Sequence, residues 1–258
     1  SMKYFICIKR LRCRTRVVFT TIFITSIFLV CVSMWEYGYR FYQRVGIQYW
    51  FDHDASSFNI SNLSELHKGS GWNYLDSKGF EKMVLVPTEC LNPKVQDGES
   101  VFEFGVGTGG ALRVLTTKYK LLKLGGSDFS SNSIKVVKTI FPNFSNNFYL
   151  LSMTDFHSMV KDSTYDHVFS FGAMGMYLHL DDIPVAVKEA VRITKPGGSL
   201  LFTHFIEPGG VHVGSIVDRV PKSFWEKNAK RFGVTGVVIQ KMDEQQKDRY
   251  AVCMTKSL

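Results

Sequence analysis

The stretch "VFEFGVGTGG", residues 101–110, decides the fold. It is a short apolar run that carries one acid, Glu103, and then breaks into a loop with four glycines. Glycine lets the backbone turn tightly after a strand and lets a ligand approach the N-terminus of the next helix. Gly105, Gly107 and Gly110 also match the G-x-G-x-x-G spacing of dinucleotide-binding loops, which alone is a weak signal. The stretch predicts a strand, a ligand-binding turn and a helix, and leaves the class of ligand open.

Beyond this loop, apolar runs alternate with helix-like stretches, a pattern typical of a parallel sheet covered on both faces. We expect strands over 100–104, 122–127, 147–152, 166–171, 199–205, 234–241 and 249–255, the last two forming an antiparallel hairpin. We expect helices after the glycine loop, over 130–140, from 181 onward and over 222–233. The sequence therefore predicts one α/β domain with a seven-stranded sheet.

The N-terminal region has a different composition. Six Lys and Arg residues and no acid occur in the first sixteen residues, and without them the net charge of +8 falls to +2. Residues 17–35 carry no charge, and as a helix they would reach about 28 Å, close to the thickness of a bilayer core. We predict a basic tail over 1–16, a transmembrane signal-anchor over 17–35, a stalk and lead-in segment over 36–70 and the folded domain over 71–258.

This organisation predicts a single-pass membrane protein of the endoplasmic reticulum or Golgi, with the side of the folded domain left open. The membrane is an expected partner through the N-terminal helix. Nucleic acid is not an expected partner, because the basic residues gather in the tail rather than on the folded domain. Whether Cys90 and Cys253 pair is open, since a disulfide requires an oxidising compartment. No metal is expected, because no His, Cys, Asp and Glu cluster has ligand spacing.

Three features argue against a dinucleotide on the glycine loop. Glu103 stands two residues before Gly105, where a ligand ammonium fits better than a phosphate. A whole segment precedes the first strand, and the last two strands form a hairpin after the "KPGG" turn at 195–198. A cationic ligand is therefore the better expectation.

Four motifs occur in a characteristic order along the chain, namely "EFGVGTGG", "SDFSSNSI", "DHVFSFGAMGMYLHLDD" and "ITKPGGSLLFTHF". Together they resemble the successive motifs of class I S-adenosylmethionine-dependent methyltransferases, in the small-molecule branch that includes quinone and phosphoethanolamine methyltransferases. The resemblance implies a Rossmann-like, mostly parallel sheet of order 3-2-1-4-5-7-6 with helices on both faces. It also implies that S-adenosylmethionine binds over the carboxyl ends of strands one, two and four.

The resemblance implies cofactor-binding roles for residues at the ends of the first two strands. Glu103 would hold the methionine ammonium, and Asp128 would accept hydrogen bonds from both ribose hydroxyls. The backbone of three glycines would pass beneath the methionine and ribose: Gly105, Gly107 and Gly109. The alternatives are a helix-dipole partner for Glu103 and a helix cap for Asp128.

The resemblance extends to the adenine of the cofactor. Phe129 would lie against the adenine face. Many relatives carry an acid after strand three that binds the adenine amine, but here Met153 stands at that position. Thr154 or Asp155 would supply the contact instead.

A catalytic base is expected just after the fourth strand. Methyl transfer mainly requires an aligned nucleophile and a site without water, and an O or N acceptor must lose a proton. His179 matches the His of phosphoethanolamine methyltransferases, and histidine titrates near neutral pH. A capping or core histidine is the alternative. Tyr177 and His204 are further candidates, and Glu207 could steer a cationic acceptor.

The segment "GWNYLDSKGFEKMVL", residues 71–85, resembles the segment that precedes the domain in phosphoethanolamine methyltransferases. Tyr74 matches the position that pairs with the catalytic His there, so it joins the catalytic candidates. Lys78 and Phe80 depart from that pattern. With only a short interval after the fifth strand, we expect residues 46–90 to roof the acceptor pocket.

The resulting hypothesis is a membrane-anchored S-adenosylmethionine-dependent methyltransferase that acts on a small-molecule or lipid-like acceptor. One alternative is a lumenal glycan O-methyltransferase, for which the sequons at Asn59, Asn62 and Asn143 would be accessible. The other is a catalytically silent module that binds the cofactor without turnover.

Overall fold

The computed structural model describes residues 26, 27, 30, 34, 48–53, 55, 63–70, 72, 74–206, 220–242 and 249–258. The chain divides into two compact units, Ser1–Ile47 and Gln48–Leu258. The fold that follows is that of the second unit.

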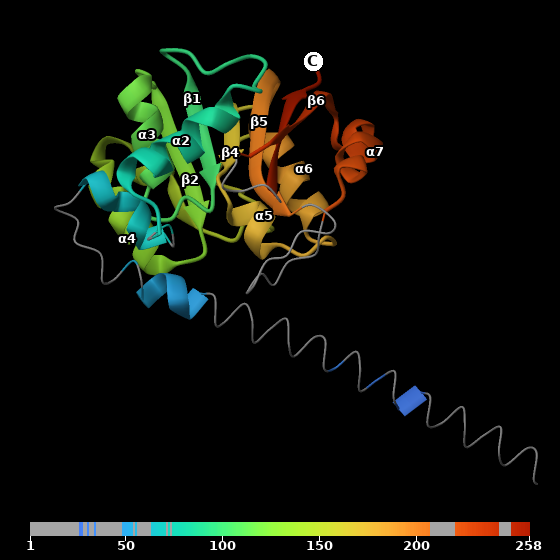
Figure 1. Cartoon of the computed structure of the whole chain (residues 1–258), viewed down its shortest axis with the longest axis horizontal. Helices are drawn as coiled ribbons and strands as arrows, with labels where there is room; N and C mark the ends of the chain where they lie inside the picture. The colour runs from blue at the N-terminus through green and yellow to red at the C-terminus, as the bar shows by residue number, and fades with distance from the viewer. Residues whose placement is uncertain are drawn as a thin grey trace, which may run out of the picture. The chain divides into compact units, whose positions relative to one another are not determined.

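The second unit is built on a seven-stranded sheet of order β3-β2-β1-β4-β5-β7-β6 (Figure 1). The first five strands pair in parallel, while β7 runs antiparallel to both β5 and β6. The strands are β1 Ser100–Phe104, β2 Lys123–Asp128, β3 Phe148–Leu150, β4 Tyr165–Ser170, β5 Thr194–Ile206, β6 Val234–Lys241 and β7 Arg249–Lys256. The predicted Rossmann-like sheet and its strand order are confirmed.

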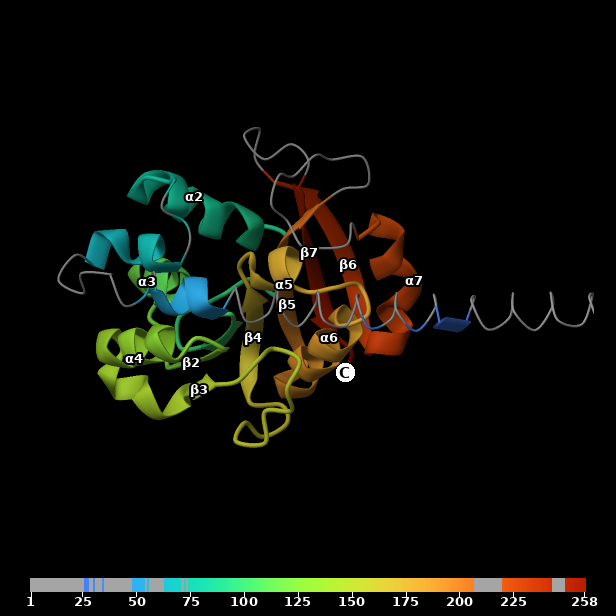
Figure 2. The same ribbon diagram turned by 90° about the horizontal axis from the view of Figure 1, so that it is seen from below.

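Side chains on alternate positions of the strands enter two separate apolar cores. Phe102 and Phe104 of β1 belong to one core and Val101 to the other, and all five residues of β1 are buried. A strand buried on both faces is expected in the middle of a parallel sheet that helices cover on both sides. Figure 2 shows α2 and α6 on opposite sides of the sheet.

The helices divide between the two faces. The helices α2 Ser77–Thr88, α3 Gly110–Lys118 and α4 Ser131–Ile140 pack on one core, and α6 Ile183–Ile193 and α7 Lys222–Phe232 pack on the other. Two 3-10 helices, η1 Leu63–Ser70 and η2 Pro142–Asn147, and the five-residue α5 Ala173–Tyr177 complete the described elements.

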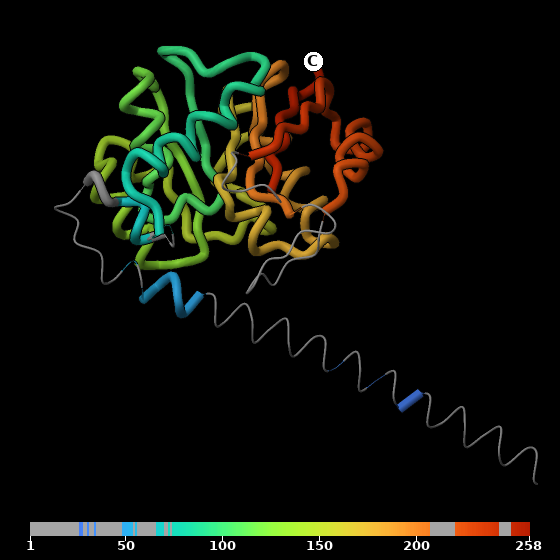
Figure 3. The backbone as a smooth tube through the Cα atoms, in the orientation of Figure 1, coloured from blue at the N-terminus to red at the C-terminus, as the bar shows by residue number. Residues whose placement is uncertain are grey.

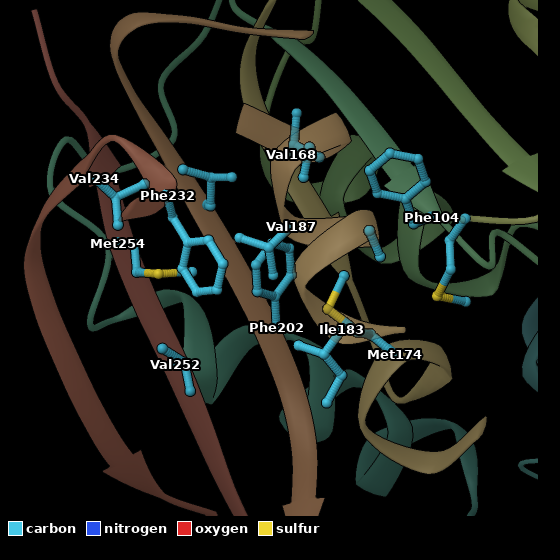
Figure 4. Packing of buried hydrophobic residues seen from close by; sticks show 14 of the residues in the cluster. Phe104, Val168, Met174, Ile183, Val187, Phe202, Phe232, Val234, Val252 and Met254 are labelled. Atoms are coloured by element: carbon cyan, nitrogen blue, oxygen red, sulfur yellow. The ribbon is translucent and has the colours of Figure 1, made fainter. Parts of the chain in front are cut away.

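The core beneath α6 fixes that helix against the centre of the sheet (Figure 4). Ile183 and Val187 recur at helical spacing and are fully buried with Phe202 of β5. Burying each large apolar side chain contributes roughly 1.5–3 kcal/mol. Met174 of α5 joins the same core, so the short helix that follows β4 is held to the sheet.

A disulfide joins two segments far apart in the sequence. Cys90, just after α2, pairs with Cys253 of β7, and their Cα atoms lie 5.9 Å apart. The smooth trace in Figure 3 follows the chain from α2 through the whole sheet to β7 at its C-terminal end. The pairing left open by the sequence is thus present, and it ties α2 to the last strand.

Several elements differ from their predicted bounds. The strand β3 is shorter than expected and β5 is longer, because β5 begins before the expected turn at 195–198. The glycine of that turn, Gly197, has a φ of +74°. The register between β4 and β5 shifts between Tyr165 and His167, so an irregular strand replaces the expected turn.

The prediction of an N-terminal transmembrane helix is wrong. Within the part of the chain that the structure describes, no helix is long and apolar enough to cross a membrane. The longest of the described helices, α2, has 12 residues and reaches about 18 Å, well short of a bilayer core of about 30 Å. The predicted single-pass membrane localisation is corrected with it. Of the expected anchor over 17–35, only residues 26, 27, 30 and 34 are described.

Candidate active site

A pocket opens at the carboxyl edge of the parallel strands, over the ends of β1, β2 and β4. Three groups of residues line it. The glycine loop and the start of α3 supply Gly105, Val106, Gly107, Gly110 and Ala111; the strand ends and α5 supply Glu103, Asp128, Phe129, Phe171, Gly172, Ala173, Met176 and Tyr177; the N-terminal segments supply Phe51, Trp72, Tyr74 and Phe80.

The glycine loop bends in a way that other residues resist. Gly105 and Gly107 have φ values of +70° and +52°. A Cβ built on Gly105 would overlap the Cβ of Ala173, so the loop and α5 approach too closely for a side chain. Gly109, at +87°, precedes α3, and a side chain there would meet Val137 of α4. Gly109 therefore serves the packing of helices, and it is absent from the described lining of the pocket.

Glu103 is the chemically unusual residue of this pocket. Its side chain is 2% exposed, and its Oε2 atom has no hydrogen-bond partner among the described residues. Burial raises the pKa of Glu103 well above its ordinary value, and the nearby charge of Asp128 adds to that rise. Since native proteins pair almost all their buried polar atoms, this oxygen calls for a ligand donor. A cationic group in the pocket would supply one, which fits the ammonium of S-adenosylmethionine.

Asp128 lies opposite Glu103, at the end of β2, and is 7% exposed. Its Oδ2 accepts from the N–H of Gly107 at 2.9 Å and its Oδ1 from the N–H of Ser130 at 2.8 Å. Burial raises its pKa to about 6, although these backbone hydrogen bonds act in the opposite direction. Because each carboxylate oxygen has two lone pairs, the group can accept a further donor beside its backbone hydrogen bonds. Ser130, rather than Asp128, caps α4.

An aromatic wall stands beside Asp128. The ring centroid of Phe51 lies 5.8 Å from that of Phe129 and 5.3 Å from that of Tyr177, each edge to face. Its neighbour Asp52 accepts from the hydroxyl of Ser130 at 2.6 Å, and this bond fastens residues 48–53 to the start of α4. The sequence did not single out Phe51. The run of aromatic and acidic residues around it, "YWFDHD" at 49–54, is the sequence signal that could have indicated it.

Three further aromatic residues from 46–90, the segment expected to roof the acceptor pocket, line this pocket. Trp72 lies over Gly172, whose φ is +85° and where a Cβ would stand 2.6 Å from the indole ring. Phe80 is buried and stacks on His67 with centroids 4.7 Å apart. Tyr74 is 62% exposed and lies at the mouth of the pocket. We call Phe51, Trp72, Tyr74 and Phe80 the roof residues.

The expected adenine contacts lie on the loop after β3. Thr154 is half-buried and lies 3.0 Å, between hydroxyl oxygens, from Ser152. Asp155 accepts from the N–H of Ser152 at 2.8 Å, which closes a turn. Met153 is buried in the core beneath Gly105. Neither Thr154 nor Asp155 is among the described lining residues of the pocket.

The expected catalytic residues occupy different positions around the pocket. Tyr177 ends α5 and, like Tyr74, lines the pocket. His179 is half-buried two residues later, and its carbonyl accepts from the N–H groups of Asp182 and Ile183 at the start of α6. It is not among the described lining residues. The structure thus brings the two tyrosines into the pocket and leaves His179 beside it.

The remaining two candidates lie near the end of β5. His204 is fully buried with a φ of +68°, and its Nδ1 lies 2.7 Å from the hydroxyl of Thr203. Its ring centroid lies 4.8 Å from that of Trp72. Glu207 lies outside the described residues. No cluster of metal-binding side chains occurs among the residues described.

Residues 102–202 match the family model described as "Methyltransferase domain", which covers β1, the glycine loop, Asp128 and most of β5. Residues 102–202 form a methyltransferase domain. The predicted family, the class I S-adenosylmethionine-dependent methyltransferases, is confirmed by this match together with the sheet order. The predicted cofactor, S-adenosylmethionine, is confirmed with it.

The methyltransferase domain has relatives of low sequence identity. An uncharacterized protein of Methanocaldococcus jannaschii is 25% identical over 171 residues, which are 66% of this chain and 56% of that protein. The chain therefore spans little more than half the length of that curated relative.

Solved structures share the fold. One is a chain of the complex between the Haloferax volcanii Trm112 methyltransferase activator and a methyltransferase, with a TM-score of 0.57, 16% identity and coverage of 69% of this chain and 89% of that one. Another is a Haemonchus contortus phosphoethanolamine N-methyltransferase in complex with phosphomonomethylethanolamine and S-adenosylhomocysteine. It has a TM-score of 0.53, 15% identity and coverage of 68% of this chain and 52% of that one.

Proposed function

We propose that this protein transfers a methyl group from S-adenosylmethionine to a small-molecule or lipid-like acceptor bound under the roof residues. The observation that carries the proposal is the buried Oε2 of Glu103, which has no partner within the described part of the chain. A carboxylate in that state is costly unless a ligand cation joins it. S-adenosylmethionine supplies an electrophilic methyl group on a sulfonium that is itself cationic.

The proposed cofactor site uses both strand ends. Glu103 accepts from the ammonium of the methionine moiety, and Asp128 accepts from the ribose hydroxyls. The backbone of Gly105 and Gly107 leaves room between them, in keeping with the positive φ of both residues. Phe129 packs against the adenine, and its edge-to-face contact with Phe51 supports that orientation.

Two loop residues complete the proposed adenine site. Thr154 or Asp155 accepts from the adenine amine after a shift of the loop, since the present turn points the Asp155 carboxylate at Ser152. Gly109 contributes by allowing α3 to begin directly after the loop.

The proposed acceptor chemistry belongs to the roof and to the end of α5. The apolar rings of Phe51, Trp72 and Phe80 exclude water, which aligns the acceptor and protects the reacting centre. The hydroxyl groups of Tyr74 and Tyr177 orient the acceptor. His179 receives the acceptor proton. Because His179 follows the wall residue Tyr177 closely in sequence but is not in the described lining, the proton passes through Tyr177 or a water.

Calorimetric titration tests the cofactor part of the proposal. S-adenosylmethionine and S-adenosylhomocysteine should both bind to the purified chain, whereas NAD and NADP should give no heat. Binding of a nicotinamide cofactor in place of both would overturn the proposal.

An assay with isotopically labelled methyl donor and a metabolite and lipid extract tests turnover. Label should appear in an extracted small molecule, and His179→Ala should reduce its rate by about 10²–10⁴-fold. The matched control is His53→Ala, whose exposed side chain lies outside the pocket lining and should leave the rate unchanged. Cofactor binding with no labelled product from any extract would favour the silent module.

A further inference from the structure

A short helical segment lies at the cofactor side of the pocket. Residues 48–52 are helical, and we call them the strap. Phe51 of the strap is 8% exposed and lines the pocket together with Asp128 and Phe129 at the end of β2. Asp52 and its contact Asn132 stand 80 positions apart in the sequence, so tertiary contacts hold the strap there.

Hydrogen bonds join the strap to the turn between β2 and α4. The Oδ1 atom of Asp52 accepts from the hydroxyl of Ser130 at 2.6 Å and from the N–H of Asn132 at 3.2 Å. In return, the side-chain amide of Asn132 donates to the carbonyl of Asp52 at 3.0 Å. The side-chain amide of Gln48 donates to the carbonyl of Phe129 at 3.2 Å. The strap is therefore fastened near both of its ends.

Ser130 connects the strap to the acid at the end of β2. Its N–H donates to Oδ1 of Asp128 at 2.8 Å, while its hydroxyl donates to Asp52. Burial is the main cause of the raised pKa of Asp128, and the nearby charge of Asp52 adds to that rise. A single residue thus links the strap to the carboxylate proposed to bind the ribose.

Phe51 places the strap against both halves of the pocket. Its ring contacts Phe129, the proposed adenine wall, and Tyr177, proposed to orient the acceptor, each edge to face. Aromatic pairs prefer this geometry, which fixes the ring in one orientation. A displaced strap would remove both contacts and open the pocket beside Asp128.

Resting on the proposed function, we propose that Asp52 is a positioning residue that keeps the strap closed over the bound cofactor. Asp52 is not among the described lining residues, so it acts through Ser130 and Phe51. S-adenosylmethionine and S-adenosylhomocysteine then leave the pocket only after the strap detaches. Segments that close over a ligand commonly limit its release in this way.

The rate at which S-adenosylhomocysteine leaves the full chain tests the proposal. Radiolabelled compound is bound, and the loss of label is followed after addition of excess unlabelled compound. Asp52→Leu should raise the dissociation rate about tenfold, because the bonds to Ser130 and Asn132 lose their acceptor. Asp52→Asn keeps an acceptor oxygen and should raise the rate by no more than about threefold.

The matched control is Glu226→Gln, which neutralises an exposed acid of α7 and should leave the dissociation rate unchanged. A dissociation rate that Asp52→Leu leaves unchanged would overturn the proposal.

A purely structural role of Asp52 would appear in a different measurement. Ser130 itself caps α4 by accepting from the N–H of Ser133 at 3.1 Å. Ser130→Ala should therefore speed release and also lower the melting temperature without cofactor. Asp52→Leu leaves this cap in place and should speed release with a smaller loss of melting temperature. A lower melting temperature in Asp52→Leu with unchanged release would make Asp52 a stabilising residue alone and refute the proposal.

A double variant tests whether Asp52 acts through Phe51. Phe51→Ala should also speed release, because it removes the ring that the strap places in the pocket. Combined with Asp52→Leu, the rate should stay close to that of the faster single variant, since coupled residues are not additive. Effects that multiply would show that the two residues act independently, contrary to the proposal.

The two proposals fail in different ways. If the wild-type protein binds neither S-adenosylmethionine nor S-adenosylhomocysteine, the proposed function fails. If it binds them but releases them at a rate that Asp52→Leu does not change, only the role of Asp52 fails.

Discussion

The carboxylate end of the pocket and its roof are assembled in different ways. Glu103 and Asp128 stand at the ends of β1 and β2, two strands that pair directly and follow one another in the chain. The roof residues come from scattered positions before β1. An end built by adjacent strands is rigid and local, while the other side depends on contacts between distant segments. The four predictions that follow test this contrast.

Loss of the Cys90–Cys253 disulfide should have the largest effect. The bond closes a loop with a sequence separation of 163, and removing such a crosslink typically costs about 4 kcal/mol. In Cys90→Ser, the free energy of unfolding from urea titration should fall by about that amount. Because the bond anchors α2 and its Phe80 to β7, acceptor turnover should fall more than cofactor affinity. The reverse order would contradict the contrast between the two sides.

Gly105→Ala should be next. The substitution imposes a side chain at a φ of +70° and brings its Cβ into overlap with Ala173, for a combined cost of about 3 kcal/mol. Gly98→Ala is the matched control, since Gly98 has a φ of +84° but open space around its Cβ position. It should lose only about 1 kcal/mol in the same urea titration. Equal losses would show that backbone strain, and not the contact with α5, constrains the loop.

The pH dependence of the free energy of unfolding should reflect the titration of the Asp128 carboxyl group. Its pKa is raised from 3.8 to about 6 on folding, so the folded state without cofactor favours the protonated form. The resulting stabilisation is present below about pH 4 and is lost as the pH rises through about 6, a loss of up to about 3 kcal/mol. Asp128→Asn should remove this part of the pH profile when wild type and variant are unfolded with urea from pH 4 to 7. Parallel profiles would exclude Asp128 as the source.

Glu103→Gln should have the smallest effect. It should weaken cofactor binding without lowering the stability of the cofactor-free protein. Affinity for S-adenosylmethionine should fall about 30-fold, because a hydrogen bond to a charged partner is worth about 2 kcal/mol. The melting temperature without cofactor should rise or stay equal, because the variant removes a buried carboxylate that has no partner among the described residues. Calorimetry and thermal unfolding measure the two. A fall in both would mean that Glu103 supports the fold and not the ligand.

Much of the sheet could be predicted because its signals are local. The strands β1 and β6 have the bounds that the apolar runs predicted, and Glu103 and Asp128 could be recognised from their positions at strand ends. Parallel strands present their carboxyl ends at one edge, so two acids at successive strand ends must face one pocket. The order of the motifs then supplied the family.

The rest depended on contacts that no local pattern encodes. The short α5 escaped prediction because five residues carry no helical period. Phe51 lies at the pocket through contacts of residues 48–53 with the start of α4, among them the bond from Ser130 to Asp52. The expected anchor has no counterpart among the described helices, none of which is long and apolar enough to cross a membrane.

The amino-acid sequence by itself determined the glycine loop and the pair of acids, because both follow from short-range periodicity and from residue types at strand ends. The order of the strands was implied by the resemblance of the motifs to a known family. Only the tertiary structure decided that Cys90 meets Cys253 and that aromatic residues from before β1 line the pocket. Those contacts join segments that are not adjacent in the sequence, and the packing of the two faces of the sheet sets them.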